Sequence, residues 1–330
     1  MTMQADGLGA GVELGTRRVL KPGPLRWLRA LGWMVLLTAV LMIVPGMLQG
    51  VVMVLGAIAG GADMAQLQAD PADVLTNAPG WSVLLGAVIM VGASIALYVG
   101  MVRGGEDRRP SELALAPAVK ELVVGLLIGL AMMAVVVAVL WAAGWVQLAQ
   151  QPVTKIAGAL AYTLQSGVTE EIVFRGVILR LLWRAFGPWA ALAISAAMFG
   201  AVHYTNPNAS AFAAACIAIE AGVMLGAFYI LTGRLWVPIG VHAAWNFAQG
   251  WLFGAPVSGT DLFSGGPLAM TVDAGTPAWL SGGAFGPEAS LPGLAMGIGI
   301  GLVVLVMAWK RGRFTSADAT LGRADDGTFD

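Results

Sequence analysis

Long, nearly uncharged apolar runs recur along this chain, and they restrict its possible folds more than any other feature. A helix needs about 20 apolar residues to cross a bilayer. The runs that approach or exceed this length lie at about 31–58, 81–102, 122–146, 156–183, 189–204, 209–231, 236–253 and 291–309. Only 11% of the residues are charged, whereas soluble domains carry about 25%. We therefore predict an all-α, polytopic transmembrane helical bundle of about eight spans.

The basic residues indicate how such a bundle is oriented. Lys and Arg gather in the N-terminal tail and then in every second connection, while the alternate connections carry Asp and Glu, with Lys155 as the exception. By the positive-inside rule, this alternation places both termini in the cytoplasm. The apolar run after the basic tail is too long for a cleaved signal peptide, so we expect a retained first span.

Polar side chains inside apolar runs are costly and mark function. The run at 156–183 contains Glu170, Glu171 and Arg175. Glu171 and Arg175 are four residues apart with the acid first, which favours an ion pair on one helix face and predicts a structural role. Glu170 points about 100° away from Glu171. It therefore lacks a cation on its own helix, which favours a role in acid–base catalysis.

The only two histidines of the chain also lie in apolar runs. Phe199 precedes His203 by four residues, so its ring is expected to pack against the imidazole and fix its orientation. His242 precedes Asn246 by the same spacing, which places both polar groups on one helix face. Cys216, the single cysteine, is expected to be a buried small hydrophobe.

In this order, Glu-Glu-x-x-x-Arg, Phe-x-x-x-His and His-x-x-x-Asn resemble the motifs of the CPBP family of CAAX-processing and bacteriocin-processing intramembrane proteases, also called the Abi family. The resemblance covers about 155–251. It implies that Glu170 and His203 activate a water molecule, and that His242 and Asn246 donate hydrogen bonds to the developing oxyanion. It also implies that two further residues of the same helix hold the glutamate in place: Glu171 and Arg175.

The family resemblance leaves the cofactor open. Glu170, His203 and His242 are numerous enough to bind a catalytic zinc, but the chain has no His-Glu-x-x-His signature. A metal-free mechanism, as in the prenyl-protein endopeptidase branch, is favoured, with no cofactor.

The expected partners are a peptide or membrane-protein substrate and the lipid bilayer, and nucleic acid is not expected. The Ala- and Gly-rich composition is typical of a GC-rich bacterial genome, so we expect a multi-pass protein of the bacterial cytoplasmic membrane. Prenylated substrates would be unexpected there. The alternatives are a catalytically silent scaffold or bacteriocin-immunity protein of the same fold, and a transporter. No repeated halves support the transporter.

These features divide the chain into six parts. The core with the catalytic motifs is expected to follow a group of N-terminal spans and to precede a Gly- and Pro-rich external loop. The predicted parts are a cytoplasmic tail at 1–30, N-terminal spans at 31–153, the CPBP-like catalytic core at 154–253, the external loop at 254–290, the last span at 291–309 and a cytoplasmic tail at 310–330.

Overall fold

The protein is mostly helical, as predicted. The computed structural model describes residues 11–70, 74–75 and 77–315. Within these residues, five helices are long and apolar enough to cross a membrane. They are α1 (Arg26–Ala59), α4 (Gly80–Glu106), α5 (Ala118–Ala142), the continuous helix Ala211–Thr232 and α13 (Leu291–Lys310). Their bounds follow the apolar runs closely, because helix formation satisfies every backbone group inside a membrane.

Three further predicted spans are helical but shorter or interrupted by charge. The run with the two glutamates is one continuous helical stretch of four pieces. They are α6 (Ile156–Leu164), η3 (Gln165–Glu170), η4 (Ile172–Leu179) and α7 (Arg180–Phe186). The other two spans correspond to α8 (Pro188–His203) and to α11 (Trp236–Phe247), which continues as η6 (Ala248–Leu252). At about 1.5 Å per residue, α8 is about 24 Å long, which is less than the about 30 Å core of a bilayer.

The helices widen into π-helix at several places around the polar residues. η3 and η4 flank Glu171, and η6 contains Gln249. A further π-segment, η5 (Ala218–Val223), separates α9 (Ala211–Ile217) from α10 (Met224–Thr232) and contains Glu220. Such widened turns often occur at functional sites, because they redirect side chains that a regular helix would place elsewhere.

Glycines allow the helices to approach closely. In α5, a side chain at Gly125 or Gly129 would overlap backbone atoms of α11. In α13, Gly297 lies against the backbone of η5 and Gly301 lies against Met224. The four-residue glycine spacing of the last apolar run therefore serves close packing between α13 and the helix Ala211–Thr232.

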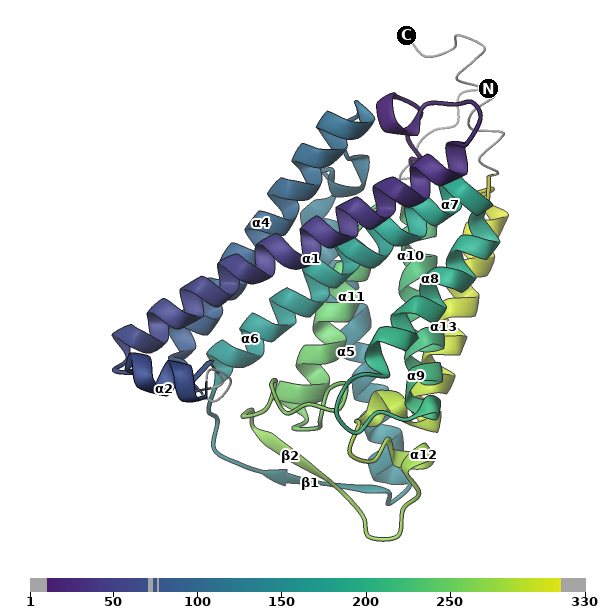
Figure 1. The fold of residues 1–330 in the computed structure, drawn as a ribbon. Helices are drawn as coiled ribbons and strands as arrows, with labels where there is room; N and C mark the ends of the chain where they lie inside the picture. The colour runs from purple at the N-terminus through teal and green to yellow at the C-terminus, as the bar shows by residue number, and fades with distance from the viewer. Residues whose placement is uncertain (1–10, 71–73, 76, 316–330) are drawn as a thin grey trace.

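A small β-sheet lies at the end of the bundle opposite the described termini (Figure 1). Strand β1 (Val146–Gln150) pairs antiparallel with β2 (Leu268–Val272), so that Val146 faces Val272. The all-α prediction is therefore wrong at this point. The third apolar run does not stay helical up to Val146, because α5 ends at Ala142 and Gly144 has a positive φ of 71°.

The remaining elements are short. The predicted external loop contains β2 and two helical turns, and other turns flank the long helices. These are η1 (Arg18–Leu20), α2 (Met64–Ala69), η2 (Ser111–Leu113), α12 (Ala278–Ser281) and η7 (Pro287–Ala289).

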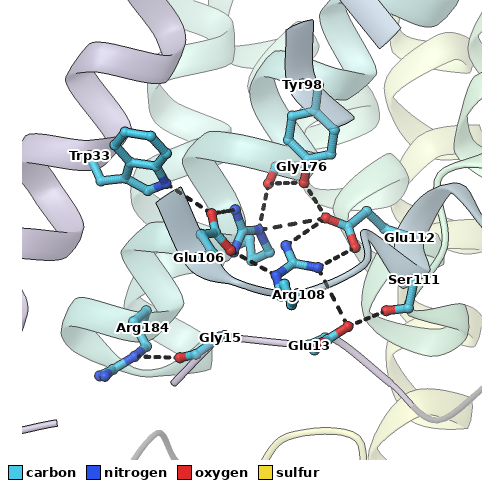
Figure 2. A network of polar contacts seen from close by, with 11 residues as sticks. Glu13, Gly15, Trp33, Tyr98, Glu106, Arg108, Ser111, Glu112, Gly176 and Arg184 are labelled. Atoms are coloured by element: carbon cyan, nitrogen blue, oxygen red, sulfur yellow. Dashed lines mark hydrogen bonds and ion pairs between the residues drawn. The ribbon is translucent and has the colours of Figure 1, made fainter. Parts of the chain in front are cut away.

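A buried ionic network fastens the end of the bundle where the described termini lie (Figure 2). Arg180 donates to both oxygens of Glu106 at 2.7 and 2.8 Å. Arg108 donates to Glu106 and to both oxygens of Glu112. Arg184 donates to backbone oxygens of the N-terminal segment, at Gly15 and Leu20. The network and the neighbouring Arg184 contacts therefore join α4, α7 and the N-terminal segment at this end of the bundle.

Candidate active site

The predicted ion pair between Glu171 and Arg175 is present in the interior of the bundle. Arg175 Nη1 donates to Glu171 Oε1 at 2.7 Å, and both side chains are at most 1% exposed. Arg175 Nη2 also donates to the Ala221 carbonyl at 2.7 Å. The guanidinium lies 4.7 Å from the centre of the Phe199 ring. Arg175 therefore ties the glutamate helix to η5 and to α8.

Glu171 has a second partner that is distant in sequence. His242 Nδ1 lies 2.8 Å from Glu171 Oε1. Because a carboxylate only accepts, Nδ1 carries the proton, and the free ring nitrogen of His242 is Nε2. Glu171 thus sets the tautomer and direction of this imidazole, as the orienting carboxylate of a catalytic triad does.

His203 is oriented by its own helix. Its Nδ1 lies 2.8 Å from the Phe199 carbonyl oxygen and therefore donates to it. The Phe199 ring packs against the His203 ring with centroids 4.6 Å apart. The neutral imidazole consequently presents the Nε2 lone pair to its surroundings, where it can accept a hydrogen bond.

Glu170 lies beside His242 but is not bonded to it. Glu170 Oε2 is 4.0 Å from His242 Nε2, and this oxygen is buried without a hydrogen-bond partner among the described residues. The Glu170 side chain as a whole is 36% exposed. A buried carboxylate oxygen without a hydrogen-bond partner destabilises the folded protein, and such atoms often have a catalytic role. This oxygen is therefore a candidate catalytic base.

Two cavities meet at His203. A cavity of about 390 Å³ between α1, α4 and α8 is lined by Glu170, His203 and mostly apolar side chains, including Met42, Met90 and Met198. A second cavity of about 30 Å³, enough for about one water molecule, is also lined by His203. Its further polar lining comes from Glu220, His242, Asn246, Ser258 and Glu288.

Asn246 completes the polar face of α11. Its Nδ2 donates to Ser166 Oγ at 3.1 Å, and Ser166 in turn donates to the Tyr162 carbonyl. An amide nitrogen has two hydrogens, so one remains for a ligand. The structure therefore brings all seven sequence-predicted site residues to one region. Glu171 and Arg175 lie behind the side chains that face the cavities, whereas Phe199 lines the smaller cavity.

A known protein family matches the region that contains this site. The family described as Type II CAAX prenyl endopeptidase Rce1-like matches residues 152–248. Residues 152–248 form an Rce1-like domain. The matched family is a family of proteases. No match was found among curated proteins or among solved structures.

The Rce1-like domain does not assemble an evident metal site. Among the described residues, no three His, Cys, Asp or Glu side chains gather closely enough to hold a metal ion. His203 and His242 each donate through Nδ1 and leave Nε2 free, as a metal ligand would, but within the described part of the chain they do not gather with Glu170 into a group of three around one point. The geometry does not fit a preformed three-ligand zinc site, and we derive no step through a metal.

Several polar groups around the Rce1-like domain were not predicted as site residues. Ser166 bonds Asn246, and Ser258 and Glu288 reach the small cavity from the segment that follows the domain. Burial raises the pKa of Glu288 to about 7, although hydrogen bonds from Ser258 and Gln249 act in the opposite direction. The sequence offered no signal for the two loop residues, because their approach depends on how a long connection folds back.

Proposed function

We propose that this protein is an intramembrane endopeptidase that hydrolyses a peptide bond of a membrane-associated protein or peptide. One observation carries the proposal. Glu170 presents a buried, unpaired carboxylate oxygen 4.0 Å from His242 Nε2, at the cavity that His203 also lines. The family assignment of this region supports a protease.

Glu170 and His203 together hold the attacking water. Both line the larger cavity, and each offers an acceptor, Oε2 of Glu170 and Nε2 of His203. A water molecule that donates one hydrogen to each acceptor directs its lone pair toward a third point, where the substrate carbonyl carbon lies. Glu170 then takes a proton as the hydroxide attacks the carbonyl.

His242 and Asn246 stabilise the charge that forms on the carbonyl oxygen. His242 donates through Nε2 when the ring is protonated, because Nδ1 already donates to Glu171. The site then carries no net charge, because the negative charges of Glu170 and Glu171 equal the positive charges of Arg175 and the His242 imidazolium. Hydrogen-bond donors in a water-poor site stabilise an oxyanion more strongly than donors in water do.

The protons balance over the full reaction. The water gives one proton to Glu170 and its oxygen to the carbonyl carbon. When the carbon–nitrogen bond breaks, Glu170 returns that proton to the leaving nitrogen. The products are a new carboxyl group and a new amine, and the enzyme ends in its starting state.

The larger cavity fits an apolar stretch of the substrate. Met42, Met198 and Val202, which line it, are 58%, 37% and 49% exposed on the outside of the bundle. The cavity therefore reaches the surface where lipid surrounds a membrane protein. Three methionines in its lining adapt to side chains of different shape. We infer that the substrate enters from the bilayer between α1 and α8.

The test is a comparison of new peptide termini in membrane and secreted fractions. Strains carrying the wild-type chain, Glu170→Gln and Asp107→Asn are compared at equal amounts of inserted protein. Asp107→Asn is a matched carboxylate-to-amide control far from the site. Asp107 has a positive φ of 55° that Asn tolerates, and its ion pairs with Arg17 and Arg18 are long and exposed.

We expect termini that are present in the wild type and in Asp107→Asn but missing in Glu170→Gln. If the Glu170→Gln strain retains all termini, the peptidase proposal fails. Retained biological activity in that strain would instead favour the silent scaffold or immunity protein.

A further inference from the structure

Two buried acids that the proposed mechanism does not use line the small cavity beside His242 and Asn246. They are Glu220, from η5, and Glu288, from η7, and each is 2% exposed. Glu288 accepts a hydrogen bond from the Ser258 amide. Glu220 Oε2 has no hydrogen-bond partner within the described part of the chain. An unpartnered carboxyl oxygen inside a cavity of a single water's size points to a proton held there.

Among the described residues that line this cavity, the cation that can face the two acids is the His242 imidazolium, and Glu170 and Glu171 together with Arg175 already balance its charge. The titratable groups that face Glu220 are His203 from α8, His242 from α11 and Cys216 from α9, besides Glu288. The guanidinium of Arg175 reaches η5, but it bonds Glu171 and backbone carbonyls.

The polar neighbours of Glu288 do not supply a charge either. Ser258 and Gln249 bond it as neutral donors. Burying a carboxylate without a cation costs several kcal/mol unless the group takes up a proton. The two acids therefore hold at least one proton between them.

Helix α13 holds both acids in place through its glycines. A side chain at Gly297 would overlap Glu220, and one at Gly293 would overlap the backbone at Pro287 and Glu288. The same face of one helix thus positions η5 and η7 against the cavity. This explains why close packing is maintained at this point of α13.

We propose that Glu220 and Glu288 form a proton-sharing carboxyl pair that limits the oxyanion side of the site to one negative charge, and that peptide hydrolysis slows when this pair loses its shared proton. This inference rests on the proposed peptidase function. The two acids are positioning residues, since they act through the field at His242 and Asn246. A second negative charge here opposes the charge that develops on the carbonyl oxygen. The pKa of Glu288, raised by burial to about 7, agrees with loss of a proton near neutrality.

The first test is the pH dependence of hydrolysis by the purified full-length protein. In the wild type, activity falls as the pair loses its proton above neutral pH. Glu288→Gln cannot ionise, so its alkaline limb moves upward by about one pH unit or more. Glu288→Asp retains a titrating group and keeps an alkaline limb near that of the wild type. An unmoved limb in Glu288→Gln overturns the proposal, because a purely structural role lowers activity equally at every pH.

The second test needs no substrate. Infrared spectra of the reconstituted protein report the carbonyl band of buried carboxylic acids. In the wild type and in Glu170→Gln, we expect part of this band to disappear as the pH is raised through neutrality. In Glu288→Gln, the band that remains should not titrate in that range. Absence of a titrating band in the wild type overturns the carboxyl pair and leaves the peptidase proposal intact, because Glu170 is tested separately.

Discussion

Replacing Arg175 by methionine tests the electrostatic core of the site. Arg175→Met keeps an apolar stem but removes the guanidinium, which is 1% exposed and donates to Glu171 and to the Ala221 carbonyl. Removing one partner of a buried ion pair costs about 3–5 kcal/mol. The orphaned carbonyl adds about 1 kcal/mol or more. We therefore expect the free energy of unfolding to fall by about 4–6 kcal/mol. This loss is expected even though the hydrogen bond from His242 to Glu171 remains in the variant.

Equilibrium unfolding in mixed micelles measures this loss. The double variant Glu171→Gln/Arg175→Met removes both charges together, so it should recover at least about 2 kcal/mol of the single variant's loss. Arg175→Lys keeps the charge but loses the planar fork, and it should lie between wild type and Arg175→Met. A loss below about 1 kcal/mol in Arg175→Met, or a double variant no more stable than it, would refute the reasoning.

Two further predictions concern packing and acid stability. Gly297→Ala overlaps Glu220 and should cost about 1–3 kcal/mol. Gly299→Ala, on the same helix with nothing within 4 Å, should be neutral or stabilising by about 0.5–1 kcal/mol; equal thermal unfolding of both variants would contradict the close contact. Burial alone would raise the pKa of Glu112, but hydrogen bonds and charge from Arg108 lower it below its ordinary value. The ionised Glu112 carboxylate therefore stabilises the folded protein at neutral pH, and this stabilisation is lost when acidification protonates it. In Glu112→Gln, the unfolding temperature should fall less between neutral and acid pH than it does in the wild type. An equal fall in both proteins would show that Glu112 does not contribute to the acid sensitivity.

The sequence predicted what depends on local periodicity. The helix bounds agree with the apolar runs to within a few residues, because a helix in a membrane must be apolar along its length. The contact between Glu171 and Arg175 was also predictable, since residues four apart share a helix face.

Contacts between distant segments were not predictable in the same way. Glu171 and His242 are 71 residues apart, and either helix could have turned its polar face elsewhere. The pairing of β1 with β2 likewise joins two connections that read as loops. Arg180 and Arg184 lie at the end of the fourth apolar run, where no local pattern predicts burial, yet both are at most 1% exposed in the structure. Their burial depends on Glu106 and on the N-terminal segment, which no local pattern connects to them.

Glu170 is proposed to activate the attacking water. The most direct test is the rate at which the reconstituted protein hydrolyses a peptide substrate, chosen from those that the comparison of peptide termini identifies. General-base catalysis contributes about 10²–10⁴-fold, so Glu170→Gln should lower kcat by at least about 100-fold while Asp107→Asn matches the wild type. A Glu170→Gln protein that folds and inserts normally and keeps kcat within a factor of about three would contradict the account.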